Sequence, residues 1–288
     1  MGVKATRRCG FPQAFWIVML LGEVTRPALC ADAPPPPIRD NSFLVEEAYN
    51  QEKGVVQHIS SFTRFRDDRN WTYTFTQEWP VRSLKHQLSF TLPVQNEGEK
   101  GTGATGVGDL ALNYRYQAVG GGDERIAFAP RLSLLLPTGD EEEGRGAGAS
   151  GLQLNLPLSF EISPRFVAHS NVGMTHVPSA RNAQGDKADI TGVHLGQSLI
   201  WLARPTFNAM LEVAWSREQD VTGPGETERG SDLFISPGIR GAFNLEGGLQ
   251  IVPGLAFPIG VGRSRGENAV LLYLSFEHPF GRSAPAED

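Results

Sequence analysis

Hydrophobic and polar residues alternate one by one along much of this chain. In residues 152–162 (LQLNLPLSFEI), the even positions carry leucine, phenylalanine or isoleucine, and the odd positions carry polar residues or proline. Residues 109–116 (DLALNYRY) and 125–136 follow the same pattern. Because successive side chains of a β-strand point to opposite faces, this period of two predicts strands with one apolar and one polar face.

Twelve segments of this kind follow one another along the chain. Each covers about 9–13 residues, which fits the roughly 9–11 residues of a tilted membrane-spanning strand better than the about 5–6 residues of a soluble strand. The first segment alternates poorly, so its register stays open. The predicted strands are residues 56–65, 71–79, 84–94, 106–117, 125–136, 152–162, 165–177, 192–203, 206–216, 232–243, 248–259 and 269–280.

The connections between these strands alternate between long and short. Residues 139–148 (GDEEEGRGAG) and 222–230 (TGPGETERG) belong to long connections, whereas residues 163–164 and 204–205 form minimal turns. An even number of strands with long loops at one end and short turns at the other is typical of bacterial outer-membrane barrels. The predicted fold is therefore all-β, a transmembrane antiparallel up-and-down β-barrel of about 12 strands.

A soluble sandwich or barrel is the competing interpretation, since its strands also alternate but turn their apolar face inward. The aromatic residues favour the membrane, because many fall on the apolar face near strand ends, where interfacial girdles form. They are Trp71, Tyr73, Phe75, Trp79, Tyr114, Tyr116, Trp201, Phe207, Trp215, Phe243, Phe276 and Phe280.

The N-terminal region has the order of a secretory signal. Lys4, Arg7 and Arg8 precede a short apolar run at residues 14–22 (AFWIVMLLG), and small residues follow. That run is shorter than the roughly 17–25 residues of a membrane helix, so residues 1–33 are predicted to be a signal peptide. Both cysteines lie within it, which removes thiol chemistry from the mature chain. Export and a barrel together predict the Gram-negative outer membrane.

The net charge of the chain limits the binding partners that can be expected. The chain has 26 Lys and Arg against 32 Asp and Glu, a formal net charge of −6. Without an extended basic surface, a nucleic-acid partner has no electrostatic support. The expected partners are outer-membrane lipid and lipopolysaccharide, the barrel-assembly machinery, and a small hydrophobic solute.

If the apolar face meets lipid, the polar face lines the lumen. Charged groups in a narrow lumen are costly unless they are paired or hydrated. They therefore form either a structural network of ion pairs and hydrogen bonds or a path that guides solutes. The predicted lumen-lining residues are Glu78, Lys85, Asp109, Arg115, Arg125, Arg131, Glu161, His169, Glu212, Arg240 and Glu277.

Residues 34–54 precede the barrel, which spans residues 55–280, and a polar tail (residues 281–288) follows it. The preceding segment shows no strand alternation. Its apolar pair Phe43-Leu44 lies beside the acidic pair Glu46-Glu47. Such a segment can pack into the lumen as a plug and meet Arg115 or Arg131, or it can be a solvated periplasmic tether, and both interpretations remain open.

Motifs with catalytic meaning are weak. Glycines at 101, 103 and 106 match a dinucleotide fingerprint, but a strand follows where the motif needs a helix. Outer-membrane phospholipases are also twelve-stranded barrels, with His and Ser two residues apart in a strand. Here His169 and Ser170 are adjacent and point to opposite faces. The acidic run 140–143 lacks the ligand spacing of a calcium loop. We expect no catalytic residues, no metal site, no cofactor and no enzymatic activity.

Three short stretches resemble an outer-membrane family named for the meta-pathway of phenol degradation. They are residues 43–59 (FLVEEAYNQEKGVVQHI), 106–109 (GVGD) and 134–139 (LLLPTG), and the resemblance covers roughly residues 40–280. It implies a barrel that passes small hydrophobic or aromatic molecules across the outer membrane. A structural or interaction barrel with an occluded lumen is the alternative function, and an outer-membrane lipid hydrolase is a weaker one.

Overall fold

The computed structural model describes residues 37–280, except residues 41, 68–69, 97–102 and 122–123. The predicted signal peptide and the polar tail lie outside the described residues. One antiparallel sheet of seventeen strand segments makes up the described part. No described helix is long and apolar enough to cross a membrane.

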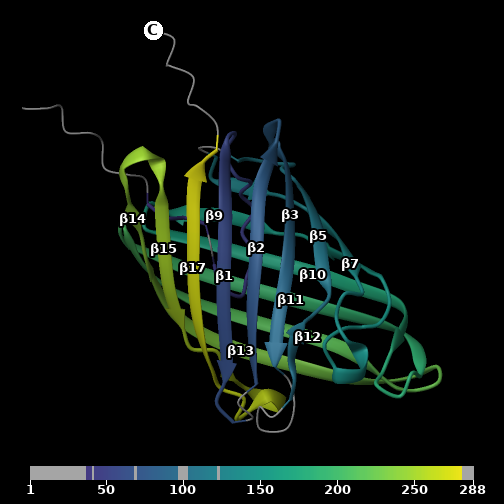
Figure 1. The fold of residues 1–288 in the computed structure, drawn as a ribbon. Helices are drawn as coiled ribbons and strands as arrows, with labels where there is room; N and C mark the ends of the chain where they lie inside the picture. Colours follow the sequence, from purple (N-terminus) through teal and green to yellow (C-terminus); the bar gives the residue numbers. More distant parts are fainter. Residues whose placement is uncertain (1–36, 41, 68–69, 97–102, 122–123, 281–288) are drawn as a thin grey trace, which may run out of the picture. The chain divides into compact units, whose positions relative to one another are not determined.

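The sheet closes on itself where its first strand pairs with its last. β1 (Val55–Phe65) pairs with β2 (Trp71–Val81) on one side and with β17 (Ala269–Pro279) on the other. Figure 1 shows β17 beside β1. Pairing the first strand with the last leaves no open edge along this seam, as a barrel requires. The fold is a closed antiparallel barrel of 12 strands, which confirms the predicted class.

Several of the twelve strands are interrupted, so that the segments outnumber them. Pro130, Pro157 and Pro258 lie at three of the interruptions. Proline has no N–H to give to a strand ladder, so the pairing breaks there and resumes beyond it. The remaining segments are β3 (Ser83–Asn96), β4 (Thr105–Val107), β5 (Leu110–Tyr116), β6 (Ile126–Phe128), β7 (Arg131–Leu136), β8 (Gly151–Asn155), β9 (Leu158–Ser163), β10 (Phe166–Arg181), β11 (Lys187–Arg204), β12 (Phe207–Gly223), β13 (Glu226–Gly241), β14 (Phe243–Asn244), β15 (Gln250–Ala256) and β16 (Ile259–Gly260).

Two predicted long loops are wrong. Residues 178–191 and 217–231 are mostly strand, because β10 to β13 continue well beyond the predicted ends and form two long hairpins (Figure 1). The pairing of β12 with β13 runs as far as Gly223 opposite Glu226. Beyond the apolar band both faces carry polar residues, so the hydrophobic period disappears although the backbone ladder continues. A narrow turn closes the second hairpin, with Gly225 at a φ of 74°.

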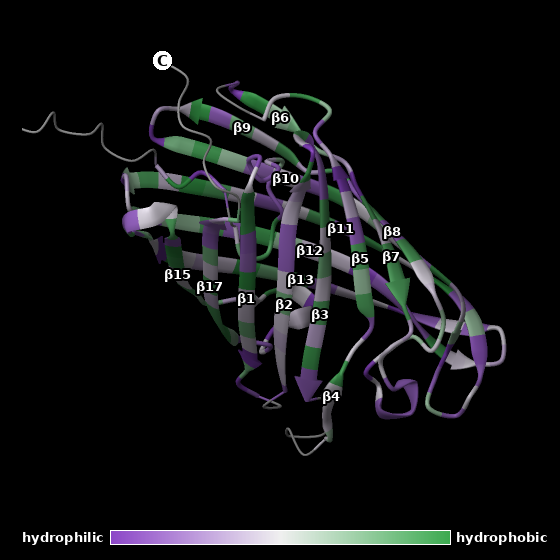
Figure 2. Ribbon diagram, turned by 45° about the horizontal axis from the view of Figure 1, so that its top comes forward, coloured by the Kyte–Doolittle hydropathy of each residue, from purple (hydrophilic) through white to green (hydrophobic). Residues whose placement is uncertain are grey.

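Hydrophobic and hydrophilic residues alternate along the strands (Figure 2), and the two faces of the barrel differ as this alternation predicts. Leu132 and Leu154 lie opposite each other on the outer face and are exposed, whereas their neighbours Ser133 and Asn155 are buried inside. The register left open for the first strand is now defined, because Gln57 is fully buried between Glu78 and Glu277.

Leu154 provides a test of this facing. It pairs with Leu132 and Met174 within the apolar outer band. Leu154→Arg is expected to destabilise the folded barrel in lipid vesicles by about 2–4 kcal/mol if the site is near the bilayer midplane, because an arginine there loses its hydration. Reversible denaturant unfolding measures the change. Leu154→Met keeps the volume and apolar character and should cost less than about 1.5 kcal/mol, so equal stability of the two variants would contradict the facing.

Candidate functional site

The segment that precedes β1 lies inside the barrel. We call residues 37–54, apart from residue 41, the lumen segment. Val45 and Ala48 in it are almost completely buried, and its polar groups bond to inward side chains from many strands. The lumen segment follows no strand ladder, so side chains of the lumen must satisfy its backbone donors and acceptors.

Glu212 of β12 holds one end of this segment. Its carboxylate accepts hydrogen bonds from three successive backbone N–H groups, those of Phe43, Leu44 and Val45, at 3.1–3.3 Å. Ser198 of β11 bonds to the Ser42 hydroxyl at 3.0 Å. Glu212 is itself fully buried, so these donors replace the water that its charge would otherwise need.

A cluster of charges surrounds the turn of the segment. Glu46 forms ion pairs with Arg131 of β7 at 2.9 Å and with Arg115 of β5 at 3.1 Å. Arg115 also contacts Glu78 of β2 at 3.5 Å and Glu47 at 3.9 Å. Three carboxyl groups thus share two guanidinium groups in a largely buried place.

Side-chain amides complete the contacts around this cluster. The side-chain amide of Asn171 of β10 accepts a hydrogen bond from the N–H of Glu46 and donates one to the Glu46 carbonyl, both at 2.7 Å. The backbone of a neighbouring strand would make the same pair of bonds. Asn155 of β8 donates to the Glu46 carboxylate at 2.6 Å. The Gln117 side chain accepts a hydrogen bond from the backbone N–H of Asn50 and donates one to the backbone carbonyl of Ala48.

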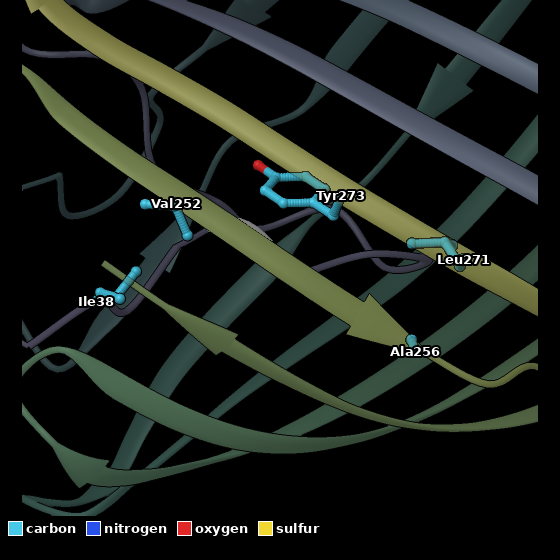
Figure 3. Packing of buried hydrophobic residues seen from close by; sticks show 5 residues of the cluster. All are labelled: Ile38, Val252, Ala256, Leu271 and Tyr273. Atoms are coloured by element: carbon cyan, nitrogen blue, oxygen red, sulfur yellow. The ribbon is translucent and has the colours of Figure 1, made fainter. Parts of the chain in front are cut away.

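The opposite wall of the lumen is apolar. Phe43 packs on Tyr273 of β17, with ring centroids 5.1 Å apart, and joins buried residues from two sides. Figure 3 shows part of this wall: Ile38 of the lumen segment with Val252 and Ala256 of β15 and Leu271 and Tyr273 of β17. A Cβ at Gly254 would meet the Phe43 ring at 2.4 Å, and one at Gly238 at 2.9 Å. Glycine at both positions therefore makes a recess for the ring.

Contacts at the short-turn end of the barrel fix where the segment enters. Arg39 forms an ion pair with Glu161 of β9. His169 of β10 donates from Nε2 to the Arg39 carbonyl at 2.9 Å, and its Nδ1 accepts the Ser159 hydroxyl at 2.7 Å. Arg240 of β13 donates to the Ile38 carbonyl at 3.0 Å.

The two neighbouring carboxyl groups of the segment differ in their electrostatics. Burial raises the pKa of Glu47 to about 8, although Arg115 opposes this shift. Burial acts on Glu46 as well, but Arg131 and Arg115 outweigh it and hold the pKa of Glu46 below its ordinary value. Glu47 therefore keeps a proton at neutral pH, and Glu46 carries the charge that the arginines bind.

The eleven charged or histidine residues named from the sequence differ in how they relate to the lumen segment. Lys85 and Arg125 are exposed near the ends of their strands, and Asp109 accepts from the backbone of Gly139 and Ala147 in the long loop beyond β7. Glu277 bonds to Gln57, which in turn bonds to Gln51 of the segment. The structure brings the others to the lumen segment, either in direct contact or, for Glu78, through Arg115: Glu78, Arg115, Arg131, Glu161, His169, Glu212 and Arg240.

Sequence reasoning missed the neutral residues that hold the segment. Asn155, Asn171, Ser159 and Gln117 carry no charge, so a search for charged groups passed over them. The first three lie at inward positions of their strands, and the alternation itself was the available signal. The glycine recess was missed as well, because nothing in the pattern shows which side chain fills it.

Open space lies at both ends of the barrel, and the lumen segment lines the cavity at one of them. A cavity of about 540 Å³ at the short-turn end is lined by Ile38, Tyr49 and Asn50 of the segment and by Leu84, Gln250 and Glu277 of the barrel. At the long-loop end, a cavity of about 350 Å³ is lined by Gln95, Asp109, Arg145, Arg181 and Asp220, among others. The segment thus separates two mouths.

The site offers little for catalysis. Ser159 and His169 lie within hydrogen-bond distance, but the second ring nitrogen of His169 bonds to a backbone carbonyl instead of an orienting carboxylate or amide side chain. The Ser159 oxygen also accepts the N–H of Ala48. Ser170 lies on the other face and bonds to Gln197. Among the described residues, no group of three or more His, Cys, Asp or Glu side chains is placed to hold a metal ion.

This arrangement defines a class of protein: a transmembrane β-barrel whose lumen contains an N-terminal segment of its own chain. The family model described as "Putative MetA-pathway of phenol degradation" matches residues 40–252. The chain belongs to this family, which confirms the resemblance seen in the sequence. No curated protein matches it significantly in sequence.

Solved structures show the same fold at low sequence identity. An outer membrane channel from Pseudomonas putida F1 has a TM-score of 0.59 and 12% identity, covering 80% of this chain and 97% of the channel. The NanC porin has a TM-score of 0.50 and 6% identity, covering 77% of this chain and 98% of the porin. These likenesses establish an outer-membrane barrel fold.

Replacing Glu212 tests how the segment is held. Glu212→Ala leaves one buried and two partly buried N–H groups without their acceptor, at a cost of about 1–3 kcal/mol. Amide hydrogen exchange of residues 43–45 should therefore become roughly 5- to 150-fold faster. Glu218→Ala is the matched control, since Glu218 lies on the same face of β12 without a contact to the segment. Unchanged exchange in Glu212→Ala, or equal acceleration in the control, would contradict this role.

Glu47 should make the binding of the lumen segment inside the barrel, which we call its docked state, depend on pH. The docked state holds a proton at pH values where a free glutamate, with an ordinary pKa of 4.5, has lost it. The docked state therefore loses stability relative to the released state as pH rises from 4.5 to about 8. After correction for intrinsic exchange rates, the amides of residues 43–48 should be less protected at pH 8.5 than at pH 6. Glu47→Gln, which does not titrate, should reduce this dependence, and an unchanged dependence would exclude Glu47 as a cause.

Proposed function

We propose that this protein is a gated outer-membrane channel, closed by its lumen segment in the observed state, that passes small hydrophobic or aromatic molecules. The single observation that carries the proposal is the position of the segment between two cavities. A segment that only filled space would not need an entrance on each side. Export and assembly through the signal peptide and the barrel-assembly machinery belong to the same proposal.

The contacts of the segment support a gate, because water can replace most of them. Neutral hydrogen bonds contribute about 0.5–1.5 kcal/mol each to docking, since the released groups become hydrated. The lumen side chains also change little when the segment leaves, because the strand ladder supports them. Release is therefore compatible with an intact barrel.

The apolar wall supports the solute class. Val167, Ile200 and Met210 line one side of the Phe43 position, and Leu271 and Tyr273 line the other. When Phe43 leaves, its recess can accept another aromatic ring by the same packing on Tyr273. The description of the family, which refers to phenol degradation, agrees with this class.

A permanently closed structural barrel is the second candidate. The observation in its favour is the number of satisfied buried groups around Glu46, Arg115 and Glu212. Conductance distinguishes the two functions, because a scaffold conducts neither with the segment nor after a mild perturbation of it.

Deletion of residues 40–52 tests the gate in planar lipid bilayers. The wild type is expected to show rare or small openings, and the deletion variant should show steady single-channel steps. Rising salt should increase the open fraction of the wild type only, because salt screens the ion pairs of Glu46. Heat-modifiable migration on a gel provides the assembly control for both proteins. If the assembled deletion variant does not conduct at any salt concentration, the closed scaffold is correct.

The same open channel tests the solute class. Phenol added at millimolar concentration should interrupt the current, whereas glycerol at the same concentration should not. Tyr273→Ala should shorten the interruptions by removing the aromatic partner, and Tyr73→Ala on the outer face of β2 is the control. Equal effects of phenol and glycerol would leave the channel but exclude the aromatic class.

A further inference from the structure

The charges of the long β12–β13 hairpin are sorted by face. Going up the hairpin from the apolar band, the inward side carries only acidic charges, at Glu218, Asp220, Glu228 and Asp232. Asp220 lines the cavity at the long-loop mouth, as do its neighbours Gln219 and Val221. Between the apolar band and the pair of Val221 with Thr227, the outward side of the hairpin carries two arginines, Arg217 and Arg229, and no acid; Glu226 follows opposite Gly223, beyond a register shift. The outward positions are Arg217, Gln219, Val221, Thr227, Arg229 and Ser231.

The two arginines are close neighbours on this surface. Arg217 lies opposite Ser231 and Arg229 lies opposite Gln219, so the arginines are diagonal neighbours. Diagonal positions of an antiparallel pair are about 7–8 Å apart. Both residues are exposed, and neither forms an ion pair with any acid among the described residues. Their guanidinium groups are therefore available to an anion from outside.

The apolar band ends directly below these arginines. Leu211, Val213 and Trp215 precede Arg217 on the outward face of β12, and Ile235 and Leu233 lead to Ser231 on the outward face of β13. Tryptophan favours the interface between hydrocarbon and headgroups. In a bilayer, Arg217 and Arg229 thus lie at headgroup level on the long-loop side. Arg217 is two residues beyond Trp215 along β12, and Arg229 lies opposite Gln219, which is four residues beyond Trp215.

We propose that Arg217 and Arg229 form a binding site for the phosphate groups of lipid A, the phosphorylated lipid of the outer leaflet. The inference rests on the proposed outer-membrane location but not on channel activity. A guanidinium group binds phosphate oxygens through two parallel N–H donors, and two adjacent arginines can hold one phosphate between them. The apolar band below accepts the acyl chains of the same molecule. The acids on the inward face disfavour binding of the phosphate in the mouth.

Binding of lipid A to the purified full-length protein in non-ionic detergent tests the site. Native mass spectrometry with bisphosphorylated lipid A gives the dissociation constant for the wild type. The double variant Arg217→Gln/Arg229→Gln should bind about tenfold more weakly. Each single variant should lose about threefold, and Arg217→Lys should lie between wild type and Arg217→Gln because it keeps the charge without the bidentate donors.

The opposite rim of the barrel provides the matched control. Arg165 and Arg204 are also exposed arginines, but they lie at the short-turn end. Arg165→Gln/Arg204→Gln should bind lipid A within twofold of the wild type, and dephosphorylated lipid A should bind all variants equally weakly. Wild-type affinity in the Arg217/Arg229 variant, an equal loss in the control pair, or tight binding of dephosphorylated lipid A would each overturn the proposal. Heat-modifiable migration confirms that every variant is folded.

Discussion

The backbone of the lumen segment has hydrogen-bonding groups that no strand ladder satisfies, and much of the structure follows from how the barrel satisfies them. Glu212 accepts three of its N–H groups, Asn171 pairs with a fourth as a strand would, and Arg115 binds carbonyls of Glu47 and Tyr49. Each partner is an inward side chain of a different strand. A buried backbone without such partners would be unstable, so the position of the segment depends on the register of the whole barrel.

The segment is held in two physically different ways on its two sides. Around Glu46 the contacts are ionic and amide contacts, which weaken with salt and can be exchanged for water. Around Phe43 the contacts are apolar, and the recess at Gly238 and Gly254 fits a ring in particular. A change in pH or salt therefore loosens the polar side first, whereas a competing aromatic molecule acts on the apolar side. The two kinds of contact give the proposed gate two separate ways to open.

The period of two predicts the architecture well because a barrel exposes one face to lipid and the other to its lumen. Strand existence, the inward position of Glu212 and the lack of a Ser170–His169 pair all follow from that alternation. The extent of β10 to β13 does not follow, since beyond the lipid both faces of a strand are polar. Whether Phe43 enters the lumen could not be predicted either, because its recess is built from glycines on β13 and β15 that are distant in sequence and lack a side chain to reveal it.

The charge of the lumen around Arg115 and Arg131 explains why the segment contributes acids there. Arg115 and Arg131 lie close together on neighbouring strands, directly opposite each other in the register, with Glu78 as the nearby carboxylate of the barrel itself. Two adjacent guanidinium groups repel each other in a place with little water. Glu46 places a carboxylate between them, which removes the repulsion and replaces their lost hydration. Once the segment leaves, water must enter to hydrate both arginines, so release of the segment and wetting of the lumen are one event, and a dry but unplugged barrel is not a stable state.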